Sequence, residues 1–257
     1  MKIGILLKQV PDTETKIQLT ADKTSVDTSA VKWIVNPYDE NAIEAAIQLK
    51  EKKGGEVIVF SMGPARCVDA MRTALAMGAD RAVRVDTADG EWDSYTTAVA
   101  LAEALKAEGV ELVFAGKQAI DDDASQMVQL VAERMGAASL GIIETFELSE
   151  DGKSATVTRP VSGGTKEIIQ VTLPAVFGCD KGLNTPRYAS LPGIMKAKAK
   201  PVVEKKGAEL LGGETIKIKK MGYSLPPERQ PGRKLTGSPQ ELVDGLVKFL
   251  KEDVKII

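Results

Sequence analysis

Short apolar runs alternate with amphipathic stretches along the first half of the chain. The apolar runs, at residues 2–7, 57–61, 82–85 and 112–115, have the length of strands and the composition of strands buried on both faces. Apolar residues recur at helical spacing between and after them, at residues 42–49, 68–77, 94–106 and 128–135. These successive strand–helix units predict an α/β fold with a doubly wound, mostly parallel sheet.

Two stretches depart from this alternation. Residues 14–35 are polar and weakly alternating, which predicts an excursion or hairpin over one edge of the sheet. From Gly141 onward, short alternating segments separated by Asp151-Gly152 and Gly163-Gly164 predict a small antiparallel excursion. The apolar run 173–177 then predicts a strand that returns to the main sheet.

The pattern becomes irregular towards the C-terminus. Residues 184–200 contain two prolines before a short helical stretch, and residues 202–237 show no sustained periodicity. An amphipathic pattern returns at residues 240–250, opened by Ser238 as N-cap and Pro239 at the first helical position. We therefore predict an α/β domain over residues 1–201 and an extended arm over residues 202–257, which needs a partner to cover it.

The site loop, residues 116–127 (GKQAIDDDASQM), carries the candidate chemistry. It follows a predicted strand, and ligands of open α/β sheets bind outside the carboxyl ends of the strands. Gly116 permits close backbone approach, Lys117 and Gln118 carry donors, and the N–H groups at the start of the next helix favour an anion. Asp121 to Asp123 would repel a bare phosphate and are also ordinary N-cap residues, so capping alone explains them equally well.

Composition narrows the chemistry further. A net charge of -2 gives no overall attraction to nucleic acid or to an anionic membrane. The chain has no His, so it lacks the usual proton shuttle and the commonest metal ligand, and we expect no catalytic and no metal-binding residues. Cys67 and Cys179 lack CxxC spacing, and we expect both to be reduced. Met1 directly precedes a strand and no apolar run reaches membrane-spanning length, so we expect a cytoplasmic protein without membrane insertion.

A set of motifs, in order along the chain, closely resembles the β subunit of electron transfer flavoproteins. The motifs are Asn36-Pro37, Ser61-Met62-Gly63-Pro64, ALAMGADR at 74–81, GKQAIDDD at 116–123, LPAV at 173–176 and LNTPRYASLPGIMKAK at 183–198. The likeness covers about residues 1–201. Each motif alone is weak, but the ordered set is specific.

The resemblance implies a nucleotide site in this chain. It implies a heterodimer whose α subunit holds most of the FAD, while the β subunit is an adenine nucleotide hydrolase-like domain that carries a structural AMP and embraces α with its arm. By position it assigns the AMP contacts to Leu6, Asn36, Pro37, Tyr38, Asp39, Met62, Gly116, Lys117, Gln118, Ala119, Ile120, Asp121, Asp122, Asp123, Ala124, Ser125, Gln126 and Met127. For Met62, a role as buried gap-filler explains the residue at least as well.

The resemblance also implies electron-transfer partners. Dehydrogenases of acyl-CoA type would donate electrons, and an acceptor of quinone-reductase type would receive them. Residues 184–200, here the recognition segment, resemble the family's docking loop, with Leu191, Pro192, Ile194, Met195 and Lys196 as partner-binding residues. A lone exposed leucine and a solvated basic face are common on any surface, but a leucine beside a proline and a basic stretch suits a docking anchor.

Departures from the family leave alternatives open. Thr13 stands where many members have a bulky residue near the flavin, so the resemblance assigns no flavin contact at this position. Ser162 stands where the family often has an acidic residue before the glycines, so we expect Glu167 to be only an exposed strand residue. A flavin-bifurcating member would bind a second FAD and oxidise NADH, but such members tend to have glycine where this chain has Asp122. A stand-alone ATP-binding module of the universal-stress type would be shorter and lack residues 184–198 and the arm.

Overall fold

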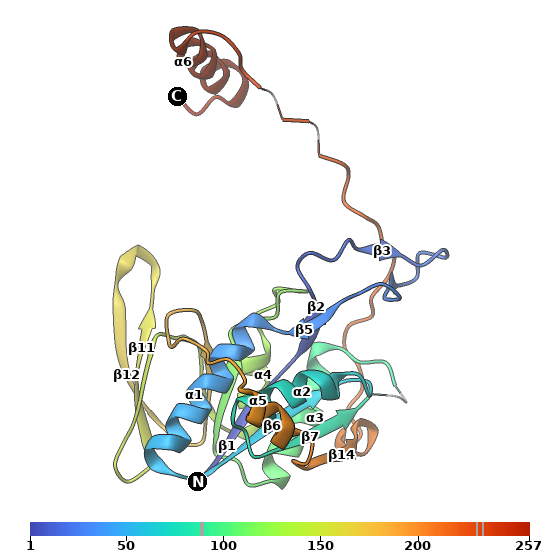
Figure 1. The fold of residues 1–257 in the computed structure, drawn as a ribbon, viewed down its shortest axis with the longest axis vertical. Helices are drawn as coiled ribbons and strands as arrows, with labels where there is room; N and C mark the ends of the chain where they lie inside the picture. The colour runs from blue at the N-terminus through green and yellow to red at the C-terminus, as the bar shows by residue number, and fades with distance from the viewer. Residues whose placement is uncertain (88–89, 230, 233) are drawn as a thin grey trace. The chain divides into compact units, whose positions relative to one another are not determined.

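A parallel sheet organises the structure, a computed structural model that describes residues 1–87, 90–229, 231–232 and 234–257 (Figure 1). Within these residues its strands are β1 (Lys2–Leu6), β6 (Glu56–Met62), β7 (Arg81–Asp86), β8 (Leu112–Gly116), β9 (Ala138–Ile143), β13 (Ala175–Cys179) and β14 (Val202–Lys206). They lie in the order β14-β7-β6-β1-β8-β13-β9, and each neighbouring pair is parallel. The doubly wound α/β fold predicted from the sequence is confirmed.

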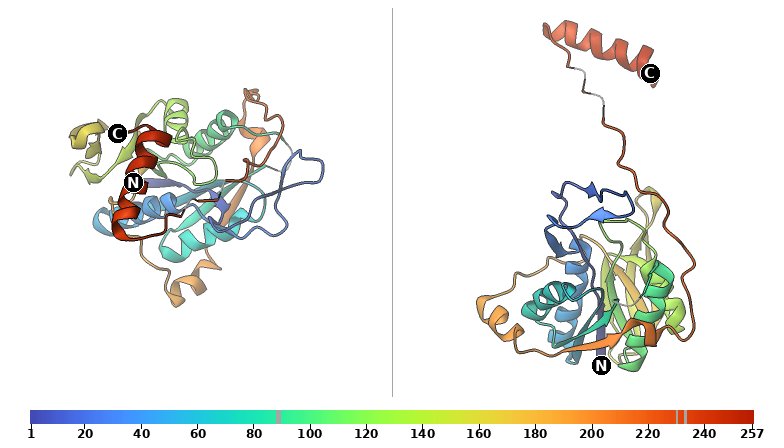
Figure 2. Two further views of the ribbon diagram at one scale, coloured as in Figure 1. Left: turned by 90° about the horizontal axis from the view of Figure 1, so that it is seen from above. Right: turned by 90° about the vertical axis from the view of Figure 1, so that its right-hand side faces the viewer.

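Helices cover both faces of this sheet (Figure 2). On one face lie α1 (Pro37–Lys53) and α2 (Cys67–Met77), and on the other lie α3 (Ser94–Ala107) and α4 (Met127–Met135). The chain proceeds from β1 to β6 and β7 on one side, and then returns past β1 to β8 on the other. The winding therefore reverses between β1 and β8, and the carboxyl ends of those two strands mark the crevice in which such sheets bind ligands.

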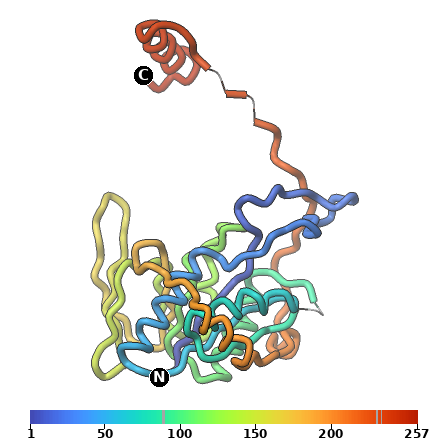
Figure 3. The backbone as a smooth tube through the Cα atoms, in the orientation of Figure 1, coloured from blue at the N-terminus to red at the C-terminus, as the bar shows by residue number. Residues whose placement is uncertain are grey.

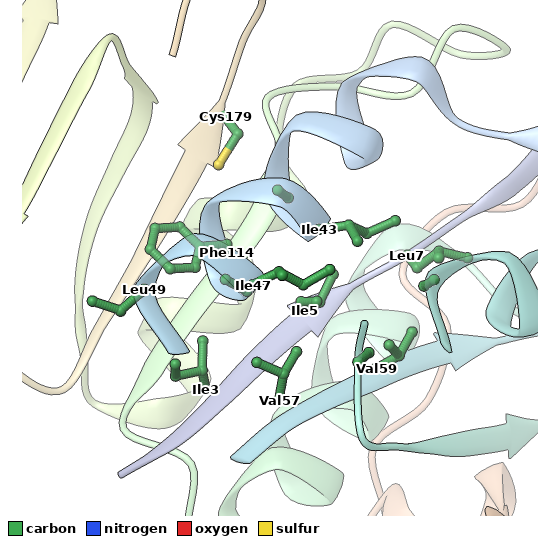
Figure 4. Close-up of a cluster of buried hydrophobic side chains, with 14 of the residues drawn as sticks. Ile3, Ile5, Leu7, Ile43, Ile47, Leu49, Val57, Val59, Phe114 and Cys179 are labelled. Carbon is green, nitrogen blue, oxygen red and sulfur yellow. The ribbon is translucent and has the colours of Figure 1, made fainter. Parts of the chain in front are cut away.

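The core between α1 and the sheet is closely packed (Figure 4). Ile43 and Ile47 of α1 lie against Ile3 and Ile5 of β1 and Phe114 of β8, and none of the five exceeds 2% exposure. Full burial of one such side chain stabilises a fold by about 1.5–3 kcal/mol. The N-terminus of α1 is thereby held over the ends of β1 and β8.

A separate antiparallel sheet packs beside the parallel one. It consists of β10 (Thr145–Leu148), β11 (Ser154–Pro160) and β12 (Lys166–Thr172). Phe146 of this sheet packs edge-to-face on Phe114 and Phe177 of the main sheet, with ring centroids 5.0 and 5.4 Å apart. The antiparallel excursion is confirmed, but it begins later than the expected Gly141, because β9 pairs in parallel with β13.

The polar stretch near the N-terminus forms short strands. β2 (Gln9–Pro11) pairs antiparallel with β5 (Trp33–Val35), and β3 (Gln18–Leu19) and β4 (Val26–Asp27) lie between them in sequence. The described chain divides into two compact units, Met1–Ile17 with Asp27–Met221, and Gln18–Val26 with Gly222–Ile257.

The C-terminal region is more regular than its sequence suggests. After α5 (Leu191–Ala197), β14 adds a parallel strand to the outer edge of β7, where an irregular arm was expected. A short 3-10 turn, Gly207–Leu210, follows. In the second unit α6 (Pro239–Lys248) follows Ser238, which forms a capping box with Glu241 and confirms the predicted N-cap. A π-helical segment, Phe249–Val254, continues α6.

Gly178 tests the packing of β13 on β9. A Cβ at this position would lie 2.0 Å from the carbonyl oxygen of Gly141, a backbone atom that the sheet holds in place. We expect Gly178→Ala to lower the free energy of unfolding by about 1–3 kcal/mol, measured by denaturant titration. Gly232→Ala is the control, because a Cβ there meets no described atom within 4 Å. Equal stability of the two variants would contradict this packing.

Candidate functional site

The candidate site lies at the carboxyl ends of three neighbouring strands. Leu6 ends β1, Met62 ends β6 and Gly116 ends β8, and Leu6 stands opposite Ala115 in the sheet register. Leu6 is buried and Met62 is half-buried against the core cluster that includes α3 and α4. The structure thus brings together groups that are up to 110 residues apart, since 116 − 6 = 110.

Asp39, in the first turn of α1, connects two of these strand ends through hydrogen bonds. One of its carboxylate oxygens accepts a hydrogen bond from the backbone N–H of Lys8, at 2.7 Å. The other accepts from the backbone N–H of Gly116 at 3.0 Å and from the Asn36 side chain at 2.9 Å. With both oxygens engaged by protein donors in a buried position, Asp39 shapes the wall of the site.

Asn36 and Gly116 complete this connection. The Asn36 amide donates to the Gln118 carbonyl oxygen at 2.8 Å, and its own oxygen accepts from the Ile120 N–H at 3.3 Å. A Cβ on Gly116 would lie 2.3 Å from an Asp39 carboxylate oxygen. The close approach expected at Gly116 is therefore an approach to Asp39. Pro37, the first residue of α1, is exposed.

Two side-chain donors of the site loop have partners within the protein. Lys117 forms an ion pair with Asp180 at 2.9 Å and lies 5.0 Å from the centre of the Tyr38 ring. The hydrogen bond from Lys117 to Asp180 raises the pKa of this lysine. Gln118 donates to Asp123 at 2.6 Å and accepts from the Ser125 hydroxyl at 3.1 Å. These contacts fix the form of the loop.

The acidic triplet is partly neutralised by a lysine that sequence reasoning missed. Lys8 Nζ lies 2.7 Å from a carboxylate oxygen of Asp121 and 3.1 Å from one of Asp122. Burial lowers the pKa of Lys8, but its hydrogen bond and charge interactions with the two aspartates outweigh that effect and raise it. The only sequence feature that points to a role for Lys8 in the site is its position directly after the first predicted strand.

The aspartates do not cap α4, as one interpretation of the sequence expected. The helix begins at Met127, after Gln126, and has no side-chain cap among the described residues. Asp122 accepts instead from the Ala124 N–H, at 3.2 Å, within the loop. The Ala124 amide, expected to face a phosphate, is therefore already engaged.

The next three amides are available to an anion. The backbone N–H groups of Ser125, Gln126 and Met127 donate to no other described residue. Asp123 and Ser125 have φ of 48° and 51°, in the left-handed region, which turns the loop sharply just before the helix. Free N–H groups at the positive end of a helix at a topological switch point form a phosphate-binding arrangement.

Comparison with known proteins gives the family. The model of the electron transfer flavoprotein domain matches residues 23–210. A β subunit of electron transfer flavoprotein from Syntrophomonas wolfei is 40% identical over 257 residues, 100% of this chain and 98% of the relative. The chain belongs to the electron transfer flavoprotein β-subunit family. Two further relatives are similar over nearly their whole lengths. The mitochondrial β subunit of Arabidopsis thaliana is 42% identical over 96% of this chain and 97% of the relative. The human β subunit is 39% identical over 98% of this chain and 97% of the relative.

Residues 184–200, the predicted recognition segment, form a second exposed feature. Its apolar side chains Leu191 and Met195 are 79% and 74% exposed, and Ile194 is 45% exposed. Pro192 and Lys196 are also exposed, so the structure places all five predicted docking residues on one surface helix, α5. Lys200 differs from its neighbours, because its ammonium donates to the carbonyl oxygens of Leu75 and Ala79.

Other features of the described residues concern metals and membranes. No three His, Cys, Asp or Glu side chains of the described residues converge to hold a metal ion. In the same part of the chain no helix combines the length and the apolarity that crossing a bilayer requires. Both cysteines are buried free thiols, and burial raises the pKa of Cys67 and of Cys179.

Asp39 makes stability depend on pH. Burial raises its pKa to about 7, against the hydrogen bonds that favour the carboxylate. Between about pH 4 and pH 7 the folded chain therefore holds a proton that the unfolded chain has released, so this group's contribution to stability falls as pH rises. The free energy of unfolding of Asp39→Asn, relative to that of wild type, should therefore rise by up to roughly 4 kcal/mol from pH 4 to pH 7, as measured by denaturant titration.

A matched control separates this effect from general acid sensitivity. Asp69, in the first turn of α2, is exposed, and Asp69→Asn should leave the pH profile unchanged. Parallel profiles for wild type and Asp39→Asn would contradict the assignment.

Proposed function

We propose that this chain is the β subunit of a heterodimeric electron carrier, that it binds a structural AMP in the site loop, and that the α subunit holds most of the FAD. The relatives named as β subunits match over nearly their whole lengths, which supports the heterodimer over a stand-alone ATP-binding module. The observation that carries the nucleotide assignment is the run of unpaired N–H groups from Ser125 to Met127 at the switch point.

The local charges suit a single monophosphate. Lys8 offsets two of the three aspartates, so the loop is less repulsive to an anion than its sequence suggests. Asp122 is about half exposed at the loop surface, where its side chain would crowd a larger, pyrophosphate-linked cofactor. We expect backbone groups near Leu6 and Met62 to recognise the adenine edge, while Asn36 and Asp39 hold the walls of the site.

The chain's part in electron transfer is to position its partners. The sequence has no His, and burial raises the pKa of both thiols, so the chain lacks the usual groups of a nucleophile and base pair. When bound at the interface with α, FAD supplies the redox chemistry. The β subunit would shield one edge of that flavin, anchor α through its C-terminal arm, and dock an acyl-CoA type dehydrogenase before electrons pass to a quinone-reductase-type acceptor.

Nucleotide content tests this assignment. The α and β chains should be co-expressed and purified together, and the nucleotides released by denaturation should be identified and counted. We expect one FAD and one AMP per heterodimer. Asp122→Gly should shift the second nucleotide towards larger dinucleotides, because it removes the carboxylate that crowds them. Two FAD in the wild-type complex would indicate a bifurcating member, and a wild-type complex without AMP would contradict the proposed site.

Leu191 tests the docking assignment. We expect Leu191→Ala to raise the KM for the flavoprotein at least tenfold when an acyl-CoA dehydrogenase reduces it, because an exposed anchor commonly contributes 2 kcal/mol or more, about a thirtyfold change. The bound FAD and AMP should be unchanged. Ile168→Ala is the matched control, since Ile168 is also 79% exposed but lies on β12. Equal KM values for Leu191→Ala and wild type would refute the docking role.

A further inference from the structure

The recognition segment is tied to α1 before it reaches its exposed part. Figure 3 traces the chain after β13 as it runs along α1 towards α5. The Asn184 amide donates to the carbonyl oxygen of Asn41 at 2.9 Å. In return, the Asn41 amide donates to the carbonyl oxygen and the side-chain oxygen of Asn184, at 3.2 and 3.1 Å. This reciprocal pair fixes the start of the segment.

Arg187, four residues before Leu191, makes a second connection to α1. Its guanidinium donates two hydrogen bonds to Glu44, at 2.8 and 3.0 Å, and two to Glu51, at 2.6 and 2.9 Å. Both glutamates lie on α1, and the Glu44 side chain is only 3% exposed. Burial raises the pKa of Glu44, but the hydrogen bonds from Arg187 and Gln48 outweigh it and lower that pKa overall. A forked guanidinium between two carboxylates has one favoured orientation.

The other end of the segment is hydrogen-bonded to α2 and to the residues just after it. Arg72 of α2 donates to the carbonyl oxygens of Ala197 and Lys200, at 2.5 and 2.6 Å, while Lys200 donates back to the end of α2. A Cβ on Gly193 would lie 2.4 Å from the Ala76 carbonyl oxygen, so the α5 backbone lies directly on α2. The backbone is held at both ends while Leu191 and Met195 remain exposed.

We propose that Arg187 is a positioning residue for dehydrogenase docking, which acts by holding the recognition segment in its docking conformation through Glu44 and Glu51. The inference rests on the docking role proposed above. A segment that is already ordered loses less conformational entropy on binding, so its affinity is higher for the same contacts. Arg187 need not touch the dehydrogenase for this effect.

Neutralising each partner of the Arg187–Glu51 pair in turn separates positioning from direct electrostatic contact. Arg187→Gln removes a positive charge, and Glu51→Gln removes a negative charge from the same network, while Glu44 keeps its arginine in the second variant. If Arg187 acted as a steering charge, the two substitutions would change the KM in opposite directions, and high salt would abolish both effects. If it positions the segment, both should raise the KM.

The measurement uses the complete α–β complex, with a purified acyl-CoA dehydrogenase reduced by butyryl-CoA as the electron donor. We expect a threefold or larger rise in the KM for the complex in Arg187→Gln and a smaller rise in Glu51→Gln, at low and high salt, with kcat unchanged. Arg187→Lys should recover only part of the loss. Hydrogen exchange of the amides at residues 188–196 should accelerate in step with the KM.

The KM values of the three variants separate the positioning role of Arg187 from the docking role of the segment. If Leu191→Ala raises the KM while Arg187→Gln and Glu51→Gln leave it unchanged or move it in opposite directions, the positioning role is overturned and the docking role stands. If Leu191→Ala has no effect, docking by this segment fails, and the positioning role fails with it. Should Arg187→Gln not yield a folded complex, Glu51→Gln decides the question by the same criteria.

Discussion

The buried carboxylate of Asp39 is the interaction on which the candidate site depends. A buried carboxyl group is costly unless hydrogen bonds compensate, and Asp39 receives three, from two strand ends and from Asn36. Those bonds join the ends of β1 and β8 to the first turn of α1, across the point at which the winding of the sheet reverses. The core beneath α1 holds the helix in the position that makes this geometry possible.

Most hydrogen-bonding groups of the site loop already have partners within the protein, which limits the groups that remain for a ligand. The side chains of Lys117 and Gln118, and the Ala124 amide, all have protein partners. What remains is a short run of backbone N–H groups at the start of α4, next to an acidic loop that Lys8 partly neutralises. The proposed site would distinguish ligands by the size and charge of their phosphate group, without needing a catalytic side chain.

Sequence reasoning identified the elements that local patterns determine. Apolar runs marked the central strands, and Ser238 with Pro239 marked the start of α6, because capping and burial depend on neighbouring residues. β14 was missed because its sequence, VVEKK, has little apolar pattern. Its pairing partner β7 also lies far away in the sequence: Val202 pairs with Ala82, 120 residues earlier.

The site loop shows the same limit at finer scale. Its position was predictable from the strand before it, but the partners of its side chains were not. Asp121 pairs with Lys8, which lies 113 residues away between β1 and β2. Helix capping by the aspartates, one of the two interpretations of the sequence, was wrong because α4 begins only at Met127. Gly116 was singled out for the close approach of a ligand, and the group that lies against it in the structure is Asp39, whose burial no local pattern reveals.

Hydrogen exchange of the α–β complex with and without AMP tests the central claim most directly. After bound nucleotide has been removed, added AMP should slow exchange at the amides of Ser125, Gln126 and Met127. The amides of Lys8 and Gly116, which already donate to Asp39, should change little. AMP binding that leaves residues 125–127 unprotected, or that protects only a different part of the chain, would contradict this account of the site.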